Sequence, residues 1–509
     1  MVGPYTTLLD ATFSSTAEDP RPPFAAVAIA AVAGAFGLVA ALSATRYGYY
    51  YDELYFIAAG KRPAFGYVDQ GPLVPLLARS MDWLFPGSFV ALRIPAVAAS
   101  VAVVVLSAVI ARELGGARGA QALTAVASAT SAFVLGQAQT LSTNGIDTLL
   151  WVLLTLLVVR WVRTRDDALL LASGLVTAAA IQVKWLIPVF WIAVVVAAGW
   201  LGPRELLRRP ALWWGGGIAV LAAVRGLIWQ ARHGWPHIGM GSVVRGQTGG
   251  LSGSLWFVPQ TLYWWGLLSA VLVVCGVWQL CRSLRLRPYR FLGVAFLLVV
   301  AVFMVSGGRS VYGAGIYPMV IAAGAVGLAA TPRRWLTIAA VPTVVLSVVA
   351  VVAYTTPWRA VSQYTPAPNR AAALSPSAYS ELGWPELISV TAAAYRELPL
   401  QQQHTAVIMT EWYVQAAALD HGRSAAGLPP VFSPNRGFGY FSVPPETADT
   451  VVYVGGTEAD LSRWFTSVVP LGRMDYSLGI PGITRDVTIW QCGGLKQPWS
   501  LMWPMMRRL

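Results

Sequence analysis

Long apolar segments recur along the chain up to residue 355, and they restrict its fold more than any other feature. A helix needs roughly 17–25 apolar residues to cross a bilayer. Since 56% of the residues are hydrophobic and 12% are charged, we expect a polytopic α-helical membrane protein with about 11 transmembrane helices. The apolar runs lie near residues 25–44, 89–111, 120–136, 147–163, 167–183, 185–202, 211–229, 255–280, 290–306, 311–330 and 335–354. The segment 167–202 could equally be one broken element.

Arginines gather in every second loop between these runs and predict the orientation of the chain. Positive residues are enriched on the cytoplasmic side of membrane proteins. An N-terminal segment 1–23 is then cytoplasmic, the transmembrane domain covers 24–355, and the loop 45–88 lies outside. This topology also explains the net charge of +13 and argues against nucleic acid as a partner. The arginines are Arg112, Arg118, Arg160, Arg163, Arg165, Arg204, Arg208, Arg209, Arg282, Arg285, Arg287, Arg290, Arg333 and Arg334.

Residues 356–509 differ in composition and predict a small extracytoplasmic α/β domain. Prolines and polar residues are frequent there, and no apolar run is long enough to span a membrane. Short apolar segments predict strands over 405–410, 450–456 and 486–492, and the pattern of 411–422 and 458–468 predicts helices. The segment 433–441, SPNRGFGYF, has the amide and aromatic mixture of a saccharide contact, although it could also form a simple turn.

Charged and aromatic residues crowd the first external loop, directly after the first apolar run. The segment 46–75 reads RYGYYYDELYFIAAGKRPAFGYVDQGPLVP. Ionisable groups close to a bilayer are costly unless they are hydrated, paired or functional. Its tyrosines could belong to an interfacial aromatic belt, but a belt does not explain the acidic pair or the DQGPL segment.

This loop resembles the first external loop of glycosyltransferase family 39 and its relatives, which include the protein O-mannosyltransferases and the lipid A aminoarabinose transferases of the GT-C fold. An acidic residue after the first helix and a D-x-P-P-L-like segment characterise that family. Gly71 stands here where the first proline is usual. The segments 411–422 and 427–441 are similar to the tail of bacterial family members. The resemblance implies a membrane glycosyltransferase that uses a polyprenyl-phosphate-linked sugar.

The resemblance implies that Asp52 is the catalytic carboxylate. Glu53 is the second candidate, with a structural role as a partner that orients a neighbouring group as its alternative. A carboxylate in this position can take the proton from an acceptor hydroxyl. Asp147 is a second candidate, in the segment GQAQTLSTNGIDTLLW at an outer helix end, where it could support Asp52. The alternative is that Asn144 or Asp147 caps the helix.

Basic side chains on the outer side are the candidate ligands of the donor phosphate, because ammonium and guanidinium groups bind phosphate strongly. Lys184 and Arg309 are the main candidates, with an interfacial or snorkelling role as the alternative. The remaining substrate contacts that we predict are Tyr312, Asp69, Gln70 and Lys61. No metal-ligand cluster is evident, so a requirement for Mg²⁺ or Mn²⁺ stays open.

We therefore predict a multi-pass enzyme of the cytoplasmic membrane that transfers a sugar to a hydroxyl of a cell-envelope glycan, lipid or protein. Two alternatives are a flippase or transporter of lipid-linked saccharides and a non-catalytic envelope scaffold. A transporter should carry charges near the midplane of broken, repeated helices. The charges of this chain collect at the outer helix ends instead.

Overall fold

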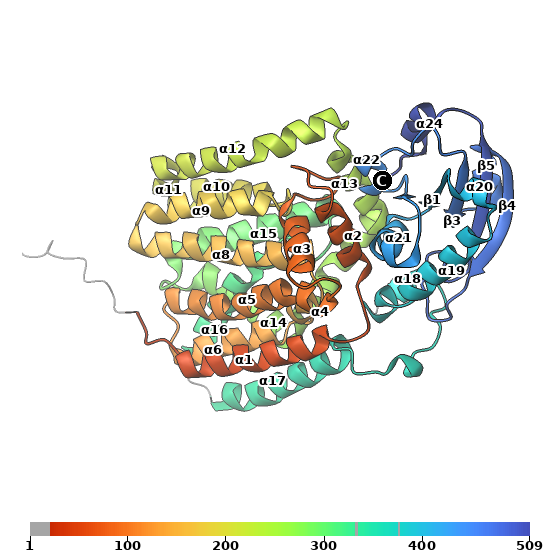
Figure 1. Cartoon of the computed structure of the whole chain (residues 1–509). Helices are drawn as coiled ribbons and strands as arrows, with labels where there is room; N and C mark the ends of the chain where they lie inside the picture. The colour runs from red at the N-terminus through yellow and green to blue at the C-terminus, as the bar shows by residue number, and fades with distance from the viewer. Residues whose placement is uncertain (1–20, 331–333, 375–376) are drawn as a thin grey trace, which may run out of the picture.

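The chain forms a bundle of long apolar helices with a smaller α/β domain at one end (Figure 1). The structure is a computed structural model that describes residues 21–330, 334–374 and 377–509. Residues 1–20 of the predicted cytoplasmic segment thus lie outside the described part. The bundle helices are α1 Ala26–Ala44, α5 Ile94–Glu113, α6 Arg118–Ala129, α7 Ala132–Ala138, α8 Thr143–Thr164, α9 Ala168–Ile181, α10 Ile187–Leu201, α12 Pro210–Arg232, α14 Gly250–Arg282, α15 Arg290–Val305, α16 Tyr317–Ala329 and α17 Arg334–Thr355.

Each of the eleven predicted runs overlaps one of these helices or the bent pair α6–α7. Within the described residues, six helices are long and apolar enough to cross a membrane, and the pair α6–α7, bent by 63°, raises this number to seven. The other four runs correspond to shorter apolar helices. The polytopic helical fold is confirmed, whereas the number of crossings stays a prediction.

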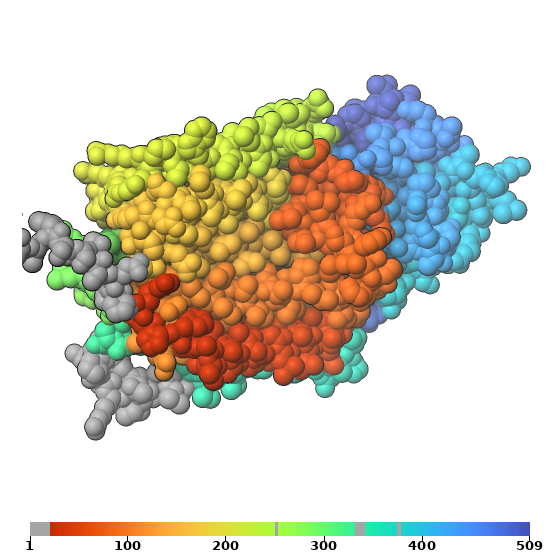
Figure 2. Space-filling model, turned by 60° about the vertical axis from the view of Figure 1, so that its left-hand side comes forward, coloured from red at the N-terminus to blue at the C-terminus, as the bar shows by residue number. Residues whose placement is uncertain are grey.

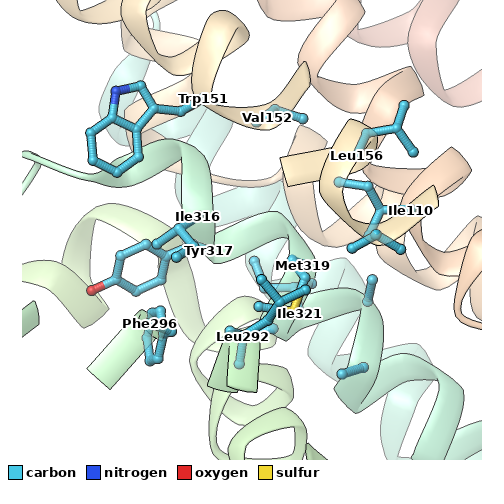
Figure 3. Packing of buried hydrophobic residues seen from close by; sticks show 14 of the residues in the cluster. Ile110, Trp151, Val152, Leu156, Leu292, Phe296, Ile316, Tyr317, Met319 and Ile321 are labelled. Atoms are coloured by element: carbon cyan, nitrogen blue, oxygen red, sulfur yellow. The ribbon is translucent and has the colours of Figure 1, made fainter. Parts of the chain in front are cut away.

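Aromatic residues and glycines pack the interior of the bundle tightly. Figure 3 shows Trp151 of α8 beside Ile316 and Tyr317, and Trp151 is fully buried. Tyr317 stacks on Trp265 with ring centroids 5.2 Å apart, so it belongs to the core. A methyl group on Gly324 would collide with the backbone of α14, so this glycine permits the close approach of α14 and α16.

The arginine-rich loops lie together at the end of the bundle that carries α11 (Glu205–Arg208), opposite the C-terminal domain (Figure 1). Glu113 at the end of α5 accepts hydrogen bonds from Arg160 and Arg163 at 2.9 and 2.8 Å. Arg209 lies 3.7 Å from Asp167 in the neighbouring loop. The described loops that the sequence assigned to one side therefore share one end of the molecule, whereas Arg333 lies outside the described residues.

At the other end, short helices from three loops meet the C-terminal domain. Figure 2 shows the first external loop in orange against the blue domain. Arg62 of this loop donates two hydrogen bonds to Asp420 of the domain, at 2.9 and 2.8 Å. The short helices at this end are α2 Tyr51–Gly60, α3 Leu73–Leu84, α4 Phe89–Leu92 and α13 Pro236–Gln247, and the 3₁₀ turns are η2 Ala314–Ile316, η3 Val361–Gln363 and η4 Ser377–Glu381. A further 3₁₀ turn, η1 Arg287–Tyr289, lies at the arginine-rich end between α14 and α15.

The C-terminal domain contains a five-stranded mixed sheet in the order β2-β1-β3-β5-β4. β1 is parallel to β2 and β3, while β5 is antiparallel to β3 and β4. The strands are β1 Ala406–Thr410, β2 Val431–Phe432, β3 Thr450–Val454, β4 Phe465–Met474 and β5 Val487–Leu495. The helices are α18 Arg370–Leu374, α19 Trp384–Arg396, α20 Leu400–Gln403, α21 Tyr413–Ala426, α22 Phe438–Phe441, α23 Glu458–Leu461 and α24 Trp499–Met506.

The strands predicted over 405–410, 450–456 and 486–492 are confirmed, as is the helix at 411–422, which corresponds to α21. The helix predicted over 458–468 is confirmed only at its start, in Glu458–Leu461, and is wrong for the rest. α23 ends at Leu461, and β4 begins at Phe465. β4 pairs with β5 from Phe465 to Met474, so cross-strand pairing decides the structure of a segment whose local pattern favours a helix.

Candidate active site

Helix α2 directs its two acidic residues to different surroundings. Asp52 and Glu53 lie in its first turn, where negative side chains are favoured by the helix dipole. Adjacent helical residues point about 100° apart, so Glu53 enters the protein interior while Asp52 lines a cavity. The predicted acidic pair therefore has two separate environments.

Glu53 is fully buried and holds α2 in place. Its Oε1 accepts a hydrogen bond from the Leu141 amide at 2.8 Å, and its Oε2 accepts one from the Tyr50 amide at 2.9 Å. Arg93 donates to the same carboxylate at 3.0 Å and also contacts Glu381 of the C-terminal domain at 3.2 Å. This environment fits the structural role that the sequence offered for Glu53, and it keeps the carboxylate out of the cavity.

A cavity of about 580 Å³ lies between the end of the helix bundle and the C-terminal domain. Its walls come from α2, from the segment before α3, from the start of α8, from the α9–α10 connection, from α13, from the segment after α15 and from the C-terminal domain. Six of the nine predicted site residues line it: Asp52, Asp69, Gln70, Lys184, Arg309 and Tyr312.

Three cations from the loops of the helix bundle, Lys184, Arg245 and Arg309, line this cavity. Lys184 donates to the amide oxygen of Asn144, and its ammonium nitrogen lies 5.1 Å from the centre of the Tyr312 ring. Arg309 donates to Gln247 at 2.9 Å, and Arg245 donates to the Ser306 carbonyl at 3.2 Å. None of these three cations has a carboxylate within ion-pair distance among the described residues, so their charges are available to an anionic ligand.

The carboxylate of Asp52 is held by the C-terminal domain. The Tyr413 hydroxyl donates to Asp52 Oδ1 at 2.8 Å, and Arg436 donates to the same hydroxyl at 3.3 Å. Burial raises the pKa of Asp52 above its ordinary value, while the hydrogen bond from Tyr413 and the charge of Arg436 oppose this rise. A carboxylate with a raised pKa is a better proton acceptor.

Three buried polar atoms of the cavity residues have no hydrogen-bond partner within the described part of the chain. They are Asp69 Oδ1, Gln70 Nε2 and Tyr55 Oη. Leaving such an atom unsatisfied costs about 1–3 kcal/mol, which a bound ligand would recover. Asp69 and Gln70 thus supply an acceptor and a donor of the kind that sugar hydroxyl groups can satisfy.

The other predicted residues lie outside the lining of the cavity. Asp147 is 7% exposed, and its Oδ1 has no hydrogen-bond partner among the described residues. It follows Asn144 by about one helical turn, and Asn144 does line the cavity. Lys61 lies 4.0 Å from Asp82 on the surface. The capping alternative for Asn144 and Asp147 is wrong, because Ser142 caps α8 by accepting from the Gly145 amide.

Sequence reasoning did not predict that the C-terminal domain supplies Tyr413 and Arg436. Arg436 has a φ of 46°, which is unusual for a residue other than glycine and is often found at functional sites. Its backbone amide donates to the Arg508 carbonyl at 2.8 Å, which fixes this conformation. The available signals were the polar and aromatic composition of the segment 433–441 and the resemblance of the segments 411–422 and 427–441 to the tail of family 39 members.

Within residues 21–330, 334–374 and 377–509, no group of three or more His, Cys, Asp or Glu side chains could hold a metal ion. His233 stacks on Trp229 with ring centroids 4.1 Å apart, and its Nδ1 lies 2.7 Å from the Trp229 carbonyl.

Comparisons with known proteins agree with this architecture. Residues 69–229 match the family profile described as dolichyl-phosphate-mannose-protein mannosyltransferase. No curated protein matches the sequence. The fold is similar to that of ArnT from Cupriavidus metallidurans in the apo state, with a TM-score of 0.59, 13% identity and coverage of 92% of this chain and 98% of ArnT.

A second structure of the same ArnT, bound to undecaprenyl phosphate, gives a TM-score of 0.54 at 13% identity, with coverage of 91% of this chain and 97% of that one. At this identity the likeness concerns the fold, and it extends over the helix bundle and the C-terminal domain together. The chain is therefore a polytopic membrane protein of the GT-C fold, similar to the family 39 glycosyltransferases that its first external loop resembles.

Proposed function

We propose that the chain is a membrane glycosyltransferase that takes a sugar from a polyprenyl-phosphate-linked donor. The observation that carries this proposal is one cavity that is lined by the half-buried carboxylate of Asp52 and by the cations Lys184 and Arg309. The similar ArnT structure contains undecaprenyl phosphate, and the matching family profile is named for a dolichyl-phosphate sugar, which supports a lipid-linked donor.

In this reaction Asp52 acts as the general base. An acceptor hydroxyl transfers its proton to the carboxylate while its oxygen attacks the anomeric carbon of the donor sugar. The bond from that carbon to the phosphate oxygen breaks, and its electron pair leaves with the polyprenyl phosphate, which gives inversion. Lys184 and Arg309 stabilise the charge that develops on the phosphate oxygen. Asn144 accepts a hydrogen bond from Lys184 and thereby orients its ammonium group.

The enzyme works at the outer face of the cytoplasmic membrane in this proposal. The arginine-rich end of the bundle is cytoplasmic by the positive-inside rule, so the cavity at the opposite end is extracytoplasmic. Nucleotide sugars are not supplied there, which favours a sugar that is carried on a lipid. The acceptor is a hydroxyl of the cell envelope, on a glycan, a lipid or a protein.

The two cations give a test of donor binding. Lys184→Met and Arg309→Met should each weaken the binding of polyprenyl phosphate by roughly 10- to 100-fold, because a hydrogen bond to a charged group is worth about 1.5–3 kcal/mol. Binding can be measured by titrating polyprenyl phosphate onto the purified protein in nanodiscs. Lys61→Met is the matched control, since Lys61 lies outside the cavity. Equal affinities in all four proteins would contradict the assignment of the phosphate site.

The hydrogen bond from Tyr413 predicts a change in the pH profile. Asp52 accepts a proton only when it is ionised, so kcat/KM falls as the pH drops through its pKa. Tyr413→Phe removes a contact that lowers this pKa, and the acidic limb of the profile should move to higher pH. Tyr379→Phe is the control, because its hydroxyl donates to the Thr365 carbonyl, away from Asp52. An unchanged limb, or a shift to lower pH, would count against Asp52 as the base.

A further inference from the structure

A second pocket, of about 270 Å³, lies beside the Asp52 cavity, and four of its nine lining residues are aromatic. Its walls come from the first external loop, from the end of α12 and from the segment 437–441 of the C-terminal domain. Trp229 and Tyr440 have ring centroids 6.2 Å apart, and those of Tyr67 and Phe441 are 6.3 Å apart. The pocket thus uses part of the segment 433–441 whose composition suggested a saccharide contact.

Tyr55 separates this pocket from the Asp52 cavity. It lines the cavity, and its ring stacks on Phe441 of the second pocket with centroids 6.1 Å apart. Gly437 faces the Tyr55 hydroxyl so closely that a methyl group at residue 437 would collide with it. The Asp52 cavity and the second pocket are therefore also lined by adjacent residues of the chain, since Arg436 lines the cavity and Gly437 lines the pocket.

The polar groups of the second pocket favour an uncharged ligand with hydroxyl groups. The Arg62 guanidinium lies 5.3 Å from the centre of the Phe441 ring, and its charge is compensated by Asp420. Among the described residues, no side-chain hydrogen bond involves the indole N–H of Trp229 or the hydroxyl of Tyr440. Both rings are partly exposed, so these groups are available to a ligand.

We propose that this pocket binds a sugar residue of the acceptor, and hence that the acceptor is a glycan. Pyranose and furanose rings present C–H faces that pack on the electron-rich faces of aromatic rings, and their hydroxyls bond to polar groups at the ring edges. The volume lies near the lower end for small-molecule sites, about 300 Å³, which suits a single sugar residue. This inference rests on the proposed function, because only the Tyr55 side chain separates the pocket from the Asp52 cavity, so a glycan bound there would lie next to the site of sugar transfer.

Binding of defined oligosaccharides tests the proposal without knowledge of the natural acceptor. The probes are linear tetrasaccharides of mannose, arabinose and galactose, titrated onto the full-length protein in nanodiscs and followed by saturation-transfer NMR. At least one of them should bind the wild type, and Trp229→Ala and Tyr440→Ala should each weaken that binding about tenfold. Trp229→Phe keeps a ring and should restore most of the affinity.

Trp256→Ala is the control, since this tryptophan is 71% exposed on α14 and lies outside both the cavity and the pocket. Thermal unfolding of each variant shows whether it is folded. Equal binding by the wild type and both alanine variants, or no binding of any tetrasaccharide to the wild type, would overturn the proposal.

A parallel measurement separates this inference from the proposed function. The wild type is given polyprenyl-phosphate mannose or polyprenyl-phosphate arabinose, and cleavage of the sugar–phosphate bond is followed. Donor cleavage without any tetrasaccharide binding would refute the glycan pocket alone. Tetrasaccharide binding that depends on Trp229, without donor cleavage, would support the pocket and refute the transferase.

Discussion

Replacing Asp52 by asparagine should lower the rate of sugar transfer by about 10²- to 10⁴-fold, which is the usual contribution of a general base. The amide has nearly the same shape as the carboxylate, and its oxygen can still accept the hydrogen bond from Tyr413. The substitution therefore removes the proton acceptor without removing the contact to the C-terminal domain. Transfer can be measured in membrane vesicles, with thermal unfolding as the check on folding.

Asp82→Asn provides the matched control for this experiment. Asp82 lies on α3 of the same external loop, about 4.0 Å from Lys61, and does not line the cavity. Its loss should leave the rate close to that of the wild type. If Asp52→Asn retained a rate similar to that of Asp82→Asn, another group would have to act as the base.

The second large effect is expected at Arg93, which joins three parts of the molecule. Arg93 is 1% exposed and contacts Glu53 of α2 and Glu381 of the C-terminal domain. It also donates to the carbonyls of Ala44 and Gly48, at 3.0 and 2.6 Å. Arg93→Met would leave two buried carboxylates without a compensating charge. We expect a loss of about 3–5 kcal/mol in the free energy of unfolding.

Chemical denaturation of the purified protein in mixed micelles can measure this loss. Arg118→Met is the control, since Arg118 is an exposed arginine at the opposite end of the bundle. It should change stability by less than about 0.5 kcal/mol. An Arg93→Met protein as stable as the Arg118→Met protein would show that the Glu53–Arg93–Glu381 contact is not a main connection between loop, bundle and domain.

The helix bundle and most of the cavity could be predicted because their signals are local. Apolar runs define helices that must face lipid or one another. Basic residues at the outer helix ends mark Lys184 and Arg309, and the resemblance of the first external loop to family 39 marks Asp52. The contribution of the C-terminal domain could not be predicted in this way. Asp52 and Tyr413 are 361 positions apart in the sequence, and no local pattern specifies such a contact.

Gly71 illustrates a departure from the family pattern that only the structure explains. Its amide donates to the Val183 carbonyl at 3.2 Å, which a proline could not do. A side chain at this position would also collide with the carbonyl of Gln182. Gly71 thereby packs the segment that carries Asp69 and Gln70 directly against the connection that carries Lys184. The departure from the usual proline thus has a packing role at the edge of the cavity.

The fate of a labelled donor tests most directly the claim that the protein is a glycosyltransferase. Membrane vesicles that contain the protein are given a polyprenyl-phosphate sugar with label in the sugar, and the label is followed in lipid, glycan and protein fractions on both sides of the membrane. The account predicts that the labelled sugar leaves the lipid and becomes bonded to an acceptor. The amount of sugar transferred should equal the amount of polyprenyl phosphate released. Label that crosses the membrane while still attached to the lipid, or that stays in place on it, would contradict a transferase.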